Sequence, residues 1–228
     1  MSDRKAAASS HNRNESPKHV SRFANLRDGG RQLAEELSSD ADLKDPIVLA
    51  IARGGVPAGR EVATLLRLTF DMLLIRRLLV PRGPGSELCA VSVGGTMVID
   101  EEVTIPTSPS TAVEHFLADA MAEFRHRQEL FRAGRAPIEL ANREVLLVDS
   151  AVHGGSTMKI AIQAVRKLNP TRVIAAVPVA SREGYALIES LVDRVVCLAQ
   201  PEPFGHAGMW YKDFSRPADE DMHEMFDS

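Results

Sequence analysis

The sequence predicts an α/β fold in which a mainly parallel, twisted sheet is flanked by helices. Short, continuous apolar runs recur along the chain and alternate with segments whose apolar residues are spaced as on one face of a helix. A continuous apolar run suits a strand that is buried on both faces, as the strands of parallel sheets are. The chain has 228 residues, 44% of them hydrophobic, which is enough for one sizeable core. We therefore expect one α/β domain over residues 21–228.

The elements are expected in the following order. Strands are predicted at 46–52, 70–75, 144–149, 172–180 and 194–199, and helices at 26–37, 56–66, 113–131, 158–168, 182–191 and 219–226. Residues 76–102 are rich in Arg, Pro and Gly and contain two β-like runs, 90–93 and 96–99, so we expect a flexible loop that leads into a hairpin. Residues 1–20 are polar and lack periodicity, which predicts a disordered tail.

Charge, cysteine usage and the length of the apolar runs exclude several classes of partner. The formal net charge is -4 and no block of Lys or Arg stands out, so no nucleic-acid partner is expected. Cys89 and Cys197 lie far apart in apolar stretches, and no His or Cys spacing is typical of a metal site, so we expect two reduced thiols and no protein metal centre. The first residues contain no apolar signal segment, and no apolar run is long enough to span a bilayer. We expect a cytoplasmic protein without a membrane partner.

Two strand ends carry the residues that we expect to form a binding site, because ligands of open parallel sheets bind beyond the carboxyl ends of the strands. Residues 53–55 (RGG) follow the first strand, and residues 149–157 (DSAVHGGST) follow a later one. The glycines allow a tight turn, and the start of the next helix directs several N–H groups toward one point, to which Ser156 and Thr157 add hydroxyls. Such a turn suits a phosphate dianion. The residues alone favour this reading and an ordinary turn capped by Ser156 or Thr157 about equally.

A run of four apolar residues, an acid and a small-residue turn ending in Gly-x-Thr, here residues 145–157, resembles the phosphoribosyl diphosphate (PRPP) motif of type I phosphoribosyltransferases. Residues 53–55 resemble that family's pyrophosphate loop, and residues 78–100 lie where the family has its flexible catalytic loop. The resemblance is closer still to predicted bacterial phosphoribosyltransferases of unassigned substrate and covers residues 22–226. Their marks are present as residues 27–31 (RDGGR), 52–57 (ARGGVP), 75–78 (IRRL), 201–204 (PEPF) and 211–214 (YKDF).

The resemblance implies transfer of a phosphoribosyl group from PRPP to a nitrogenous acceptor with release of pyrophosphate, an activity of nucleotide metabolism. The roles that it implies fall into three groups: Gly154, Gly155, Ser156 and Thr157 hold the 5′-phosphate, Asp149 and Ser150 hold the ribose, and Arg53, Arg77 and the backbone of Gly54 and Gly55 hold the pyrophosphate. Mg²⁺ is expected to be bound mainly through substrate oxygens. The expected partner is a phosphorylated ribose ligand, a homodimer stays open, and acceptor contacts are expected from a small hood formed by both chain ends.

Three positions depart from the family motif. Ser150 stands where a second acid is usual, Gly154 stands where a Thr is usual, and His153 replaces a small residue. A charge-assisted hydrogen bond is about twice as strong as a neutral one, so the serine predicts weaker ribose binding or a different ribose phosphate. The alternative to a transferase is therefore a non-catalytic, regulatory protein that binds a nucleotide or a ribose phosphate. A third reading is a lytic or transfer reaction on another ribose phosphate.

For several residues the sequence leaves two or more interpretations open. Arg53 needs an anionic partner at its strand end, which is either a ligand or a carboxylate of the protein itself. Arg77 contacts either pyrophosphate or solvent, and His153 contacts a phosphate, acts as a base, or does neither. The aromatic residues of the C-terminal segment either form a pocket for a base or pack that segment onto the core; they are Phe204, Trp210 and Tyr211.

Overall fold

The computed structural model describes residues 22–39, 43–79, 87–93, 96–99, 111–132, 134–136, 138–218, 221–222 and 224–227. The tail expected at 1–20 lies outside these ranges, as do residues 80–86 of the expected loop.

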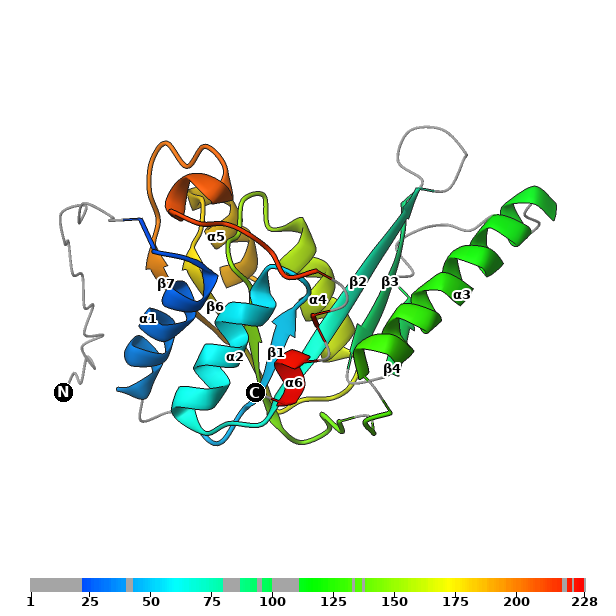
Figure 1. The fold of residues 1–228 in the computed structure, drawn as a ribbon, viewed down its shortest axis with the longest axis horizontal. Helices are drawn as coiled ribbons and strands as arrows, with labels where there is room; N and C mark the ends of the chain where they lie inside the picture. The colour runs from blue at the N-terminus through cyan, green and yellow to red at the C-terminus, as the bar shows by residue number, and fades with distance from the viewer. Residues whose placement is uncertain are drawn as a thin grey trace, which may run out of the picture.

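Seven strands of the described residues form a sheet in the order β4-β3-β2-β1-β5-β6-β7 (Figure 1). They are β1 (Ile47–Ile51), β2 (Phe70–Leu79), β3 (Glu87–Val93), β4 (Thr96–Ile99), β5 (Glu144–Val148), β6 (Arg172–Val179) and β7 (Arg194–Ala199). Neighbours among β2, β1, β5, β6 and β7 pair in parallel, whereas β3 and β4 pair antiparallel at one edge. The mainly parallel sheet predicted from the sequence is confirmed.

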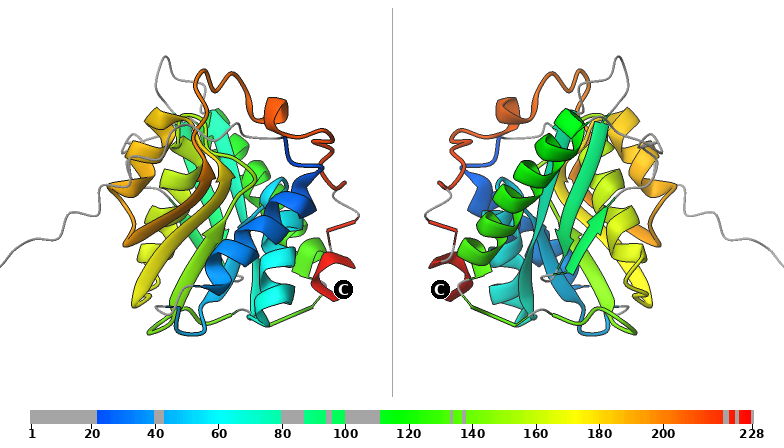
Figure 2. Two further views of the ribbon diagram at one scale, coloured as in Figure 1. Left: turned by 90° about the vertical axis from the view of Figure 1, so that its left-hand side faces the viewer. Right: turned by 90° about the vertical axis from the view of Figure 1, so that its right-hand side faces the viewer.

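Helices cover both faces of the sheet, as Figure 2 shows. They are α1 (Leu26–Ser38), α2 (Gly55–Leu66), α3 (Thr111–Arg132), α4 (Ser156–Arg166), α5 (Arg182–Glu189), the 3₁₀ turn η1 (Ala207–Trp210) and α6 (Glu224–Asp227). Val145 and Leu147 of β5 belong to a core shared with α4 and α5, whereas Leu146 and Val148 belong to a core shared with α1 and α2. Successive side chains of a strand point to opposite faces, so a strand with helices on both sides needs a continuous apolar run.

The predicted loop at 76–102 needs correction, because residues 76–79 and 87–89 are strand. β2 continues to Leu79 and pairs antiparallel with β3, from Leu73 opposite Val93 to Leu79 opposite Glu87. An antiparallel ribbon at a sheet edge tolerates polar residues, since only one face has to be buried, so the arginines did not end the strand. The predicted hairpin of 90–93 with 96–99 is confirmed as β3 and β4. Within the expected helix at 219–226, the described residues give α6, which begins at Glu224.

The ribbon of β2 and β3 is joined to α3 by a buried ion pair. Nη1 of Arg132, at the end of α3, donates to Oδ1 and Oδ2 of Asp71 in β2 at 3.1 and 2.9 Å. Both side chains are almost completely enclosed. A buried pair of this kind fixes the end of α3 against the sheet, because neither charge is stable there without the other.

Among the described residues, no helix combines the length and the apolar character that a membrane span requires.

The two ends of the domain meet in the expected hood, which we define as residues 22–25 and 204–216. The Phe23 amide donates to the Trp210 carbonyl at 2.9 Å, and the Lys212 amide donates to the Phe23 carbonyl at 2.8 Å. The Asp213 amide continues the pairing by donating to the Ala24 carbonyl at 3.1 Å. The hood therefore includes a short parallel pairing of its N-terminal and C-terminal parts.

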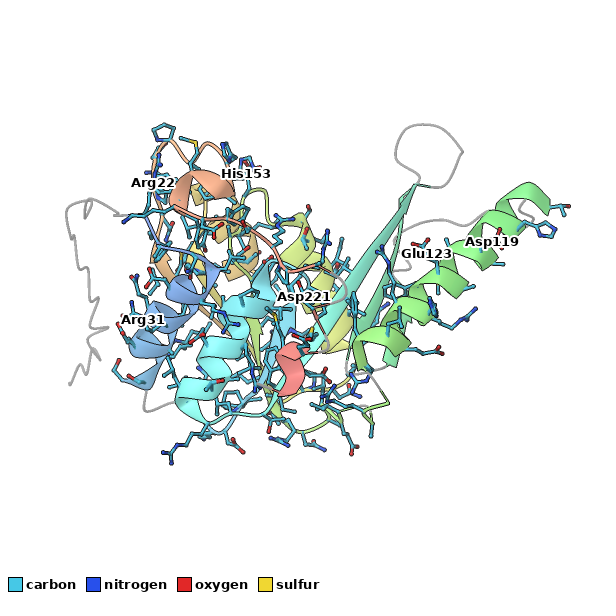
Figure 3. All side chains as sticks on the ribbon, in the orientation of Figure 1. Arg22, Arg31, Asp119, Glu123, His153 and Asp221 are labelled. Atoms are coloured by element: carbon cyan, nitrogen blue, oxygen red, sulfur yellow. The ribbon has the colours of Figure 1, made fainter. Side chains whose placement is uncertain are left out.

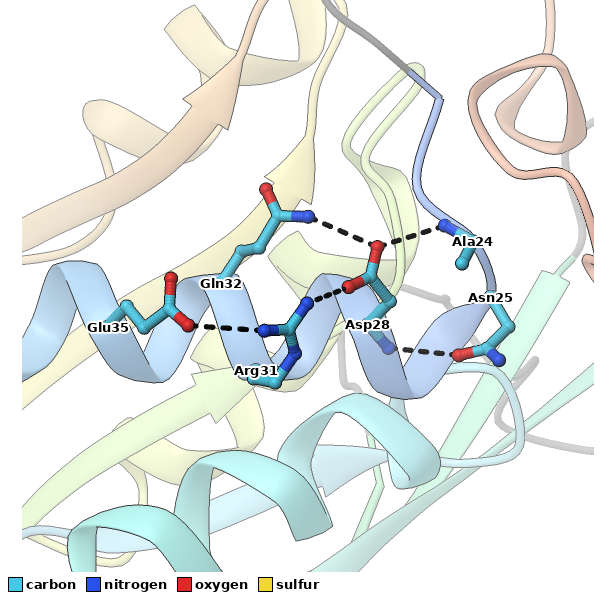
Figure 4. Close-up of polar contacts among 6 residues, drawn as sticks. All are labelled: Ala24, Asn25, Asp28, Arg31, Gln32 and Glu35. Atoms are coloured by element: carbon cyan, nitrogen blue, oxygen red, sulfur yellow. Dashed lines mark hydrogen bonds and ion pairs between the residues drawn. The ribbon is translucent and has the colours of Figure 1, made fainter.

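Asp28 ties the N-terminal part of the hood to α1 (Figure 4). Its Oδ2 accepts hydrogen bonds from the Ala24 amide at 2.9 Å and from Gln32 Nε2 at 3.1 Å. Its Oδ1 pairs with Arg31, and Asn25 caps the helix by accepting from the Asp28 amide. Burial alone would raise the pKa of Asp28, but these hydrogen bonds and the Arg31 charge lower it below its ordinary value.

The two glycines that follow Asp28 allow α1 to pack closely. A Cβ on Gly30 would lie 2.3 Å from the carbonyl oxygen of Ala58 in α2, and a Cβ on Gly29 would lie 2.9 Å from Cγ of Pro178 in β6. No side chain fits at such distances. In the Arg-Asp-Gly-Gly-Arg motif of residues 27–31, the acid thus anchors the hood and the two glycines allow close packing of α1.

Candidate functional site

A cavity of about 310 Å³ lies at the carboxyl ends of β1 and β5. These strands are neighbours in the sheet, with Ala50 opposite Val148, so the loops that follow them meet. Residues 51–54 and 149–158 line the cavity, and the hood adds Ala207, Phe214 and Arg216. The two strand ends singled out in the sequence are therefore brought together. Of the predicted site residues, the lining includes Arg53, Gly54, Asp149, Ser150, His153, Gly154, Gly155, Ser156 and Thr157.

The loop after β1 brings Arg53 and Gly54 to the cavity. The Ala52–Arg53 peptide bond is cis, and the Arg53 side chain is exposed. A Cβ on Gly54 would lie 2.9 Å from Oγ of Ser150. Gly55 is buried beneath this loop, where a Cβ would lie 2.6 Å from the Val148 carbonyl oxygen. Gly55 thus lets the start of α2 approach the end of β5, a packing role that the sequence reading did not include.

Asp149 is half-buried where β5 ends. Its Oδ1 accepts hydrogen bonds from the Ser150 amide at 2.7 Å and from Ser150 Oγ at 3.4 Å. Burial raises the pKa of Asp149 to about 6, although both contacts with Ser150 and the charge of Arg216 favour the ionised form. A carboxylate shielded from water and facing a cavity interacts strongly with any hydroxyl or cation that enters.

The turn after Asp149 leads directly into α4. Gly155 is the N-cap residue, adopts a φ of 76°, and makes no side-chain capping bond. This left-handed backbone favours glycine. The N-cap is therefore neither Ser156 nor Thr157, which excludes the alternative that this is an ordinary turn capped by one of these two residues. A Cβ on Gly154 would meet nothing within 4 Å, so the backbone of the turn borders open space.

His153 is exposed at the rim of this turn (Figure 3). Its ring stacks on that of Phe204, with centroids 5.1 Å apart and an interplanar angle of 21°. His153 thus joins the turn after β5 to the hood, a contact that the sequence did not predict. Arg77 lies in β2 opposite Cys89, and its side chain falls outside the described part of the structure.

The aromatic residues of the C-terminal segment mostly pack the hood onto the core, as the second reading predicted. Phe204 and Tyr211 are buried in a cluster with Phe23, against which Trp210 packs. Trp210 Nε1 donates to the Phe204 carbonyl at 2.8 Å. The aromatic residue that lines the cavity is instead Phe214.

Arg216 is the site residue that sequence reasoning missed. Its guanidinium lies 5.2 Å from the centroid of the Phe214 ring, and it lines the cavity together with that ring. No periodicity or strand end marks residue 216. The sequence feature that could have identified Arg216 is its position two residues after the 211–214 motif, in the segment expected to form the hood.

Oxygen donors for a cation are sparse in this cavity. The described residues contain no group of three or more His, Cys, Asp or Glu side chains suited to a metal ion. Asp149 and the Ser150 hydroxyl are the donors at the end of β5. Cys197 is a free, half-buried thiol, and burial raises its pKa to about 11.

Comparisons with known proteins identify a family and a fold for the chain. Residues 19–212 match the family model described as "Phosphoribosyl transferase domain". The chain is 34% identical over 206 residues to two curated Mycobacterium tuberculosis proteins, named "Putative phosphoribosyl transferase MT0597" and "Putative phosphoribosyl transferase Rv0571c". The match covers 90% of this chain and 46% of each relative, so the chain spans about half their length. The crystal structure of TT1426 from Thermus thermophilus is 32% identical, with a TM-score of 0.74 over 90% of this chain and 97% of that one.

Proposed function

The chain belongs to the phosphoribosyl transferase domain family, and from this premise we propose that it transfers a 5-phosphoribosyl group from PRPP to a nitrogenous acceptor and releases pyrophosphate. One observation carries the proposal. The Arg53 loop, Asp149 and the start of α4 line a common cavity at the carboxyl ends of two neighbouring parallel strands. PRPP has a phosphate at one end, a ribose in the middle and a diphosphate at the other end. These three parts match the start of α4, Asp149 and the Arg53 loop, respectively.

Each part of the cavity is assigned one part of the ligand. The backbone N–H groups of residues 154–157, at the positive end of the α4 dipole, bind the 5′-phosphate. The Asp149 carboxylate accepts hydrogen bonds from the ribose hydroxyls, and Arg53 with the Gly54 backbone binds the diphosphate. The acceptor is bound beneath the hood, whose side chains reach the cavity at Ala207 and Phe214.

In the proposed reaction, the bond from the anomeric carbon to the diphosphate oxygen breaks and the oxygen keeps the electron pair. A lone pair of the acceptor nitrogen forms the new bond to the anomeric carbon, and the proton that this nitrogen loses passes to the departing pyrophosphate or to water. The sugar carries positive charge and the leaving group carries negative charge in the transition state. The protein contributes by holding the reactants in line and by stabilising these charges with groups already in place.

We further propose that Mg²⁺ accompanies the diphosphate. Asp149 and the Ser150 hydroxyl fit this hard cation, which favours oxygen ligands and takes few of them from a protein when a phosphate ligand is present. When bound, the ion neutralises charge on the leaving group. Since the described residues lack a larger cluster of candidate ligands, most of its ligands are expected to come from the substrate and water.

Ser150 favours a second candidate function, the non-catalytic binding of a ribose phosphate or nucleotide. Its side chain is 4% exposed and its Oγ donates to Asp149 at 3.4 Å. The Ser150 hydroxyl is thus hydrogen-bonded within the protein. A carboxylate at the same position, as in the family motif, would instead strengthen the contacts to a ribose. In this alternative the cavity binds the ligand and the protein responds without turnover.

Pyrophosphate release from PRPP in the presence of a panel of purine, pyrimidine and amine acceptors distinguishes the two functions. Turnover above the uncatalysed rate that is lost in Asp149→Asn supports the transferase. Tight PRPP binding without turnover on any acceptor supports the regulatory alternative. Absence of both PRPP binding and turnover contradicts the two proposals together.

Arg53 tests the assignment of the diphosphate end. Arg53→Ala should weaken the binding of PRPP and pyrophosphate roughly tenfold or more, while ribose 5-phosphate binding and the melting temperature change little. Arg182→Ala removes another exposed arginine, one that pairs with Glu202 at the surface, and serves as the control for lost charge. Equal losses for all three ligands, or a large fall in melting temperature, would assign Arg53 to a structural ion pair.

A further inference from the structure

Arg216 comes from the hood but reaches the same cavity as Arg53 and Asp149. A Cβ on Gly54 would lie 3.5 Å from Arg216 Nε, so this side chain lies directly over the loop that follows β1. Its side chain is exposed, and its guanidinium rests on the Phe214 ring. Arg216 and Arg53 therefore approach the Gly54 region from two different parts of the chain.

The charges that line the cavity favour an anion at this end. Its lining residues include two arginines, Arg53 and Arg216, and one carboxylate, that of Asp149. A planar guanidinium such as that of Arg216 can donate two parallel hydrogen bonds to the oxygens of one phosphate. Stacking on Phe214 restricts its rotamers, which lowers the entropy lost when it binds a ligand.

The backbone that carries Arg216 is itself held in place. The Asp213 amide donates to Ala24, and the Ser215 amide donates to Oδ1 of Asp213 at 2.9 Å, which forms a local turn. Ala24 is in turn bound by Asp28 of α1. The hood thus fixes the backbone position from which the Arg216 side chain reaches the Gly54 loop.

We propose that Arg216 binds the diphosphate group of PRPP from the hood side, opposite Arg53. The proposal rests on the proposed function and adds a residue to its site. The position of Arg216 favours the diphosphate over an anionic acceptor as its ligand, because Arg216 lies over Gly54, in the loop assigned to the diphosphate. A diphosphate held in this way joins the hood to the core, so the hood contributes to binding the leaving group as well as to enclosing the acceptor.

The test is calorimetric titration of the full chain with inorganic pyrophosphate, ribose 5-phosphate and PRPP, each with Mg²⁺. Arg216→Ala should weaken the binding of pyrophosphate and PRPP by about tenfold to a hundredfold and leave ribose 5-phosphate binding within about twofold. Arg216→Lys should recover only part of the loss, because the ammonium keeps the charge and lacks the fork. Lys212→Ala is the matched control: it removes one positive charge from the same exposed segment, away from the cavity lining, and should leave all three affinities unchanged.

The results separate this inference from the proposed function. If the wild type binds PRPP and Arg216→Ala still binds pyrophosphate as tightly, the inference is overturned and the proposed function stands. The inference is likewise overturned if Arg216→Ala changes only the KM of an acceptor, or if Lys212→Ala weakens pyrophosphate binding equally. If the wild type binds neither PRPP nor pyrophosphate, the proposed function fails first, and the inference fails with it.

Discussion

The hydroxyl of Tyr211 donates a hydrogen bond to the backbone carbonyl of Ser150. Tyr211 belongs to the hood and Ser150 to the turn that carries Asp149, so this bond connects the hood to the Asp149 side of the cavity. Burial raises the pKa of Tyr211 well above its ordinary value, and the nearby Asp149 and Asp28 charges raise it further. The hydroxyl therefore stays protonated near neutral pH and is available there as a donor.

Removing this hydroxyl should loosen the connection. Tyr211→Phe leaves the Ser150 carbonyl without this donor and should lower the free energy of unfolding by about 1–2 kcal/mol. Urea denaturation measures this change. Tyr185→Phe is the control, because Tyr185 is half-buried on α5, outside the cavity lining, and should cost less. Equal costs for the two variants would show that the contact with Ser150 contributes nothing particular.

Because of Asp149, the protein should be more stable in mild acid than at neutral pH. Its pKa of about 6 exceeds the value of about 3.9 expected in the unfolded chain, so the folded state holds the proton more tightly. Stability should therefore fall as the pH rises from about 4 to 6, and the penalty should persist above 6. Asp149→Asn removes the penalty and should stabilise the protein at pH 7 by at most about 3 kcal/mol, less after allowance for partial exposure, with no gain at pH 4.

Asp28→Asn provides a control of opposite sign for that experiment. The pKa of Asp28 is lowered in the folded protein, so its ionised form stabilises the fold above the unfolded pKa and loses this effect as the pH falls through the folded value. The Asn variant should therefore be less stable than the wild type at pH 7 and nearly equal at low pH. Parallel pH profiles for the two variants would contradict both assignments.

Ser150→Asp restores the second acid of the family motif. It should tighten Mg²⁺-dependent binding of PRPP by about 1 kcal/mol, because a charged acceptor replaces a neutral one beside the ribose. Two neighbouring carboxylates would repel each other, but the Ser150 hydroxyl and Arg216 both lie close to the Cβ position of Gly54, so the guanidinium offsets part of the added charge. Calorimetry of wild type, Ser150→Asp and the uncharged Ser150→Asn decides the matter; unchanged or weaker binding in the Asp variant favours the regulatory function.

Gly30→Ala should separate α1 from α2. The added Cβ would lie 2.3 Å from the Ala58 carbonyl oxygen, so overpacking should outweigh the gain in helix propensity and cost about 1–3 kcal/mol. Gly154→Ala adds the same methyl group where nothing lies within 4 Å and should change stability by less than about 0.5 kcal/mol. Urea denaturation compares the two. A stable Gly30→Ala protein would show that the helices move apart at little cost.

The core and the two loops of the site could be predicted from the sequence because both depend on local patterns. After Glu144, β5 is apolar to its end, since both of its faces are covered, and the acid that follows it marks the edge at which open parallel sheets bind ligands. The length of β2 could not be predicted, because its last residues owe their conformation to pairing with β3, and pairing leaves no periodic signal in polar residues.

Arg216 was missed for a related reason. Its place over Gly54 depends on the pairing of residues 23–24 with residues 210–213, nearly two hundred positions apart in the chain. Gly55 illustrates a different case: the sequence singled it out for binding pyrophosphate, whereas the structure gives the close contact with β5 as a reason for glycine there. Spacing along the chain identifies the residue types of a site and leaves their three-dimensional partners undetermined.

The pairing of Phe23 with Tyr211 joins two segments that are made at opposite ends of the domain's synthesis. α1 and the parallel strands can begin to assemble as soon as they leave the ribosome, since domains fold from the N-terminal side as the chain grows. The hood has to wait, because residues 22–25 find their hydrogen-bond partners only after residues 210–213 have been made. Until then the cavity lacks Phe214 and Arg216, so a nascent chain that already has the Arg53 loop and the α4 turn has an incomplete cavity lining.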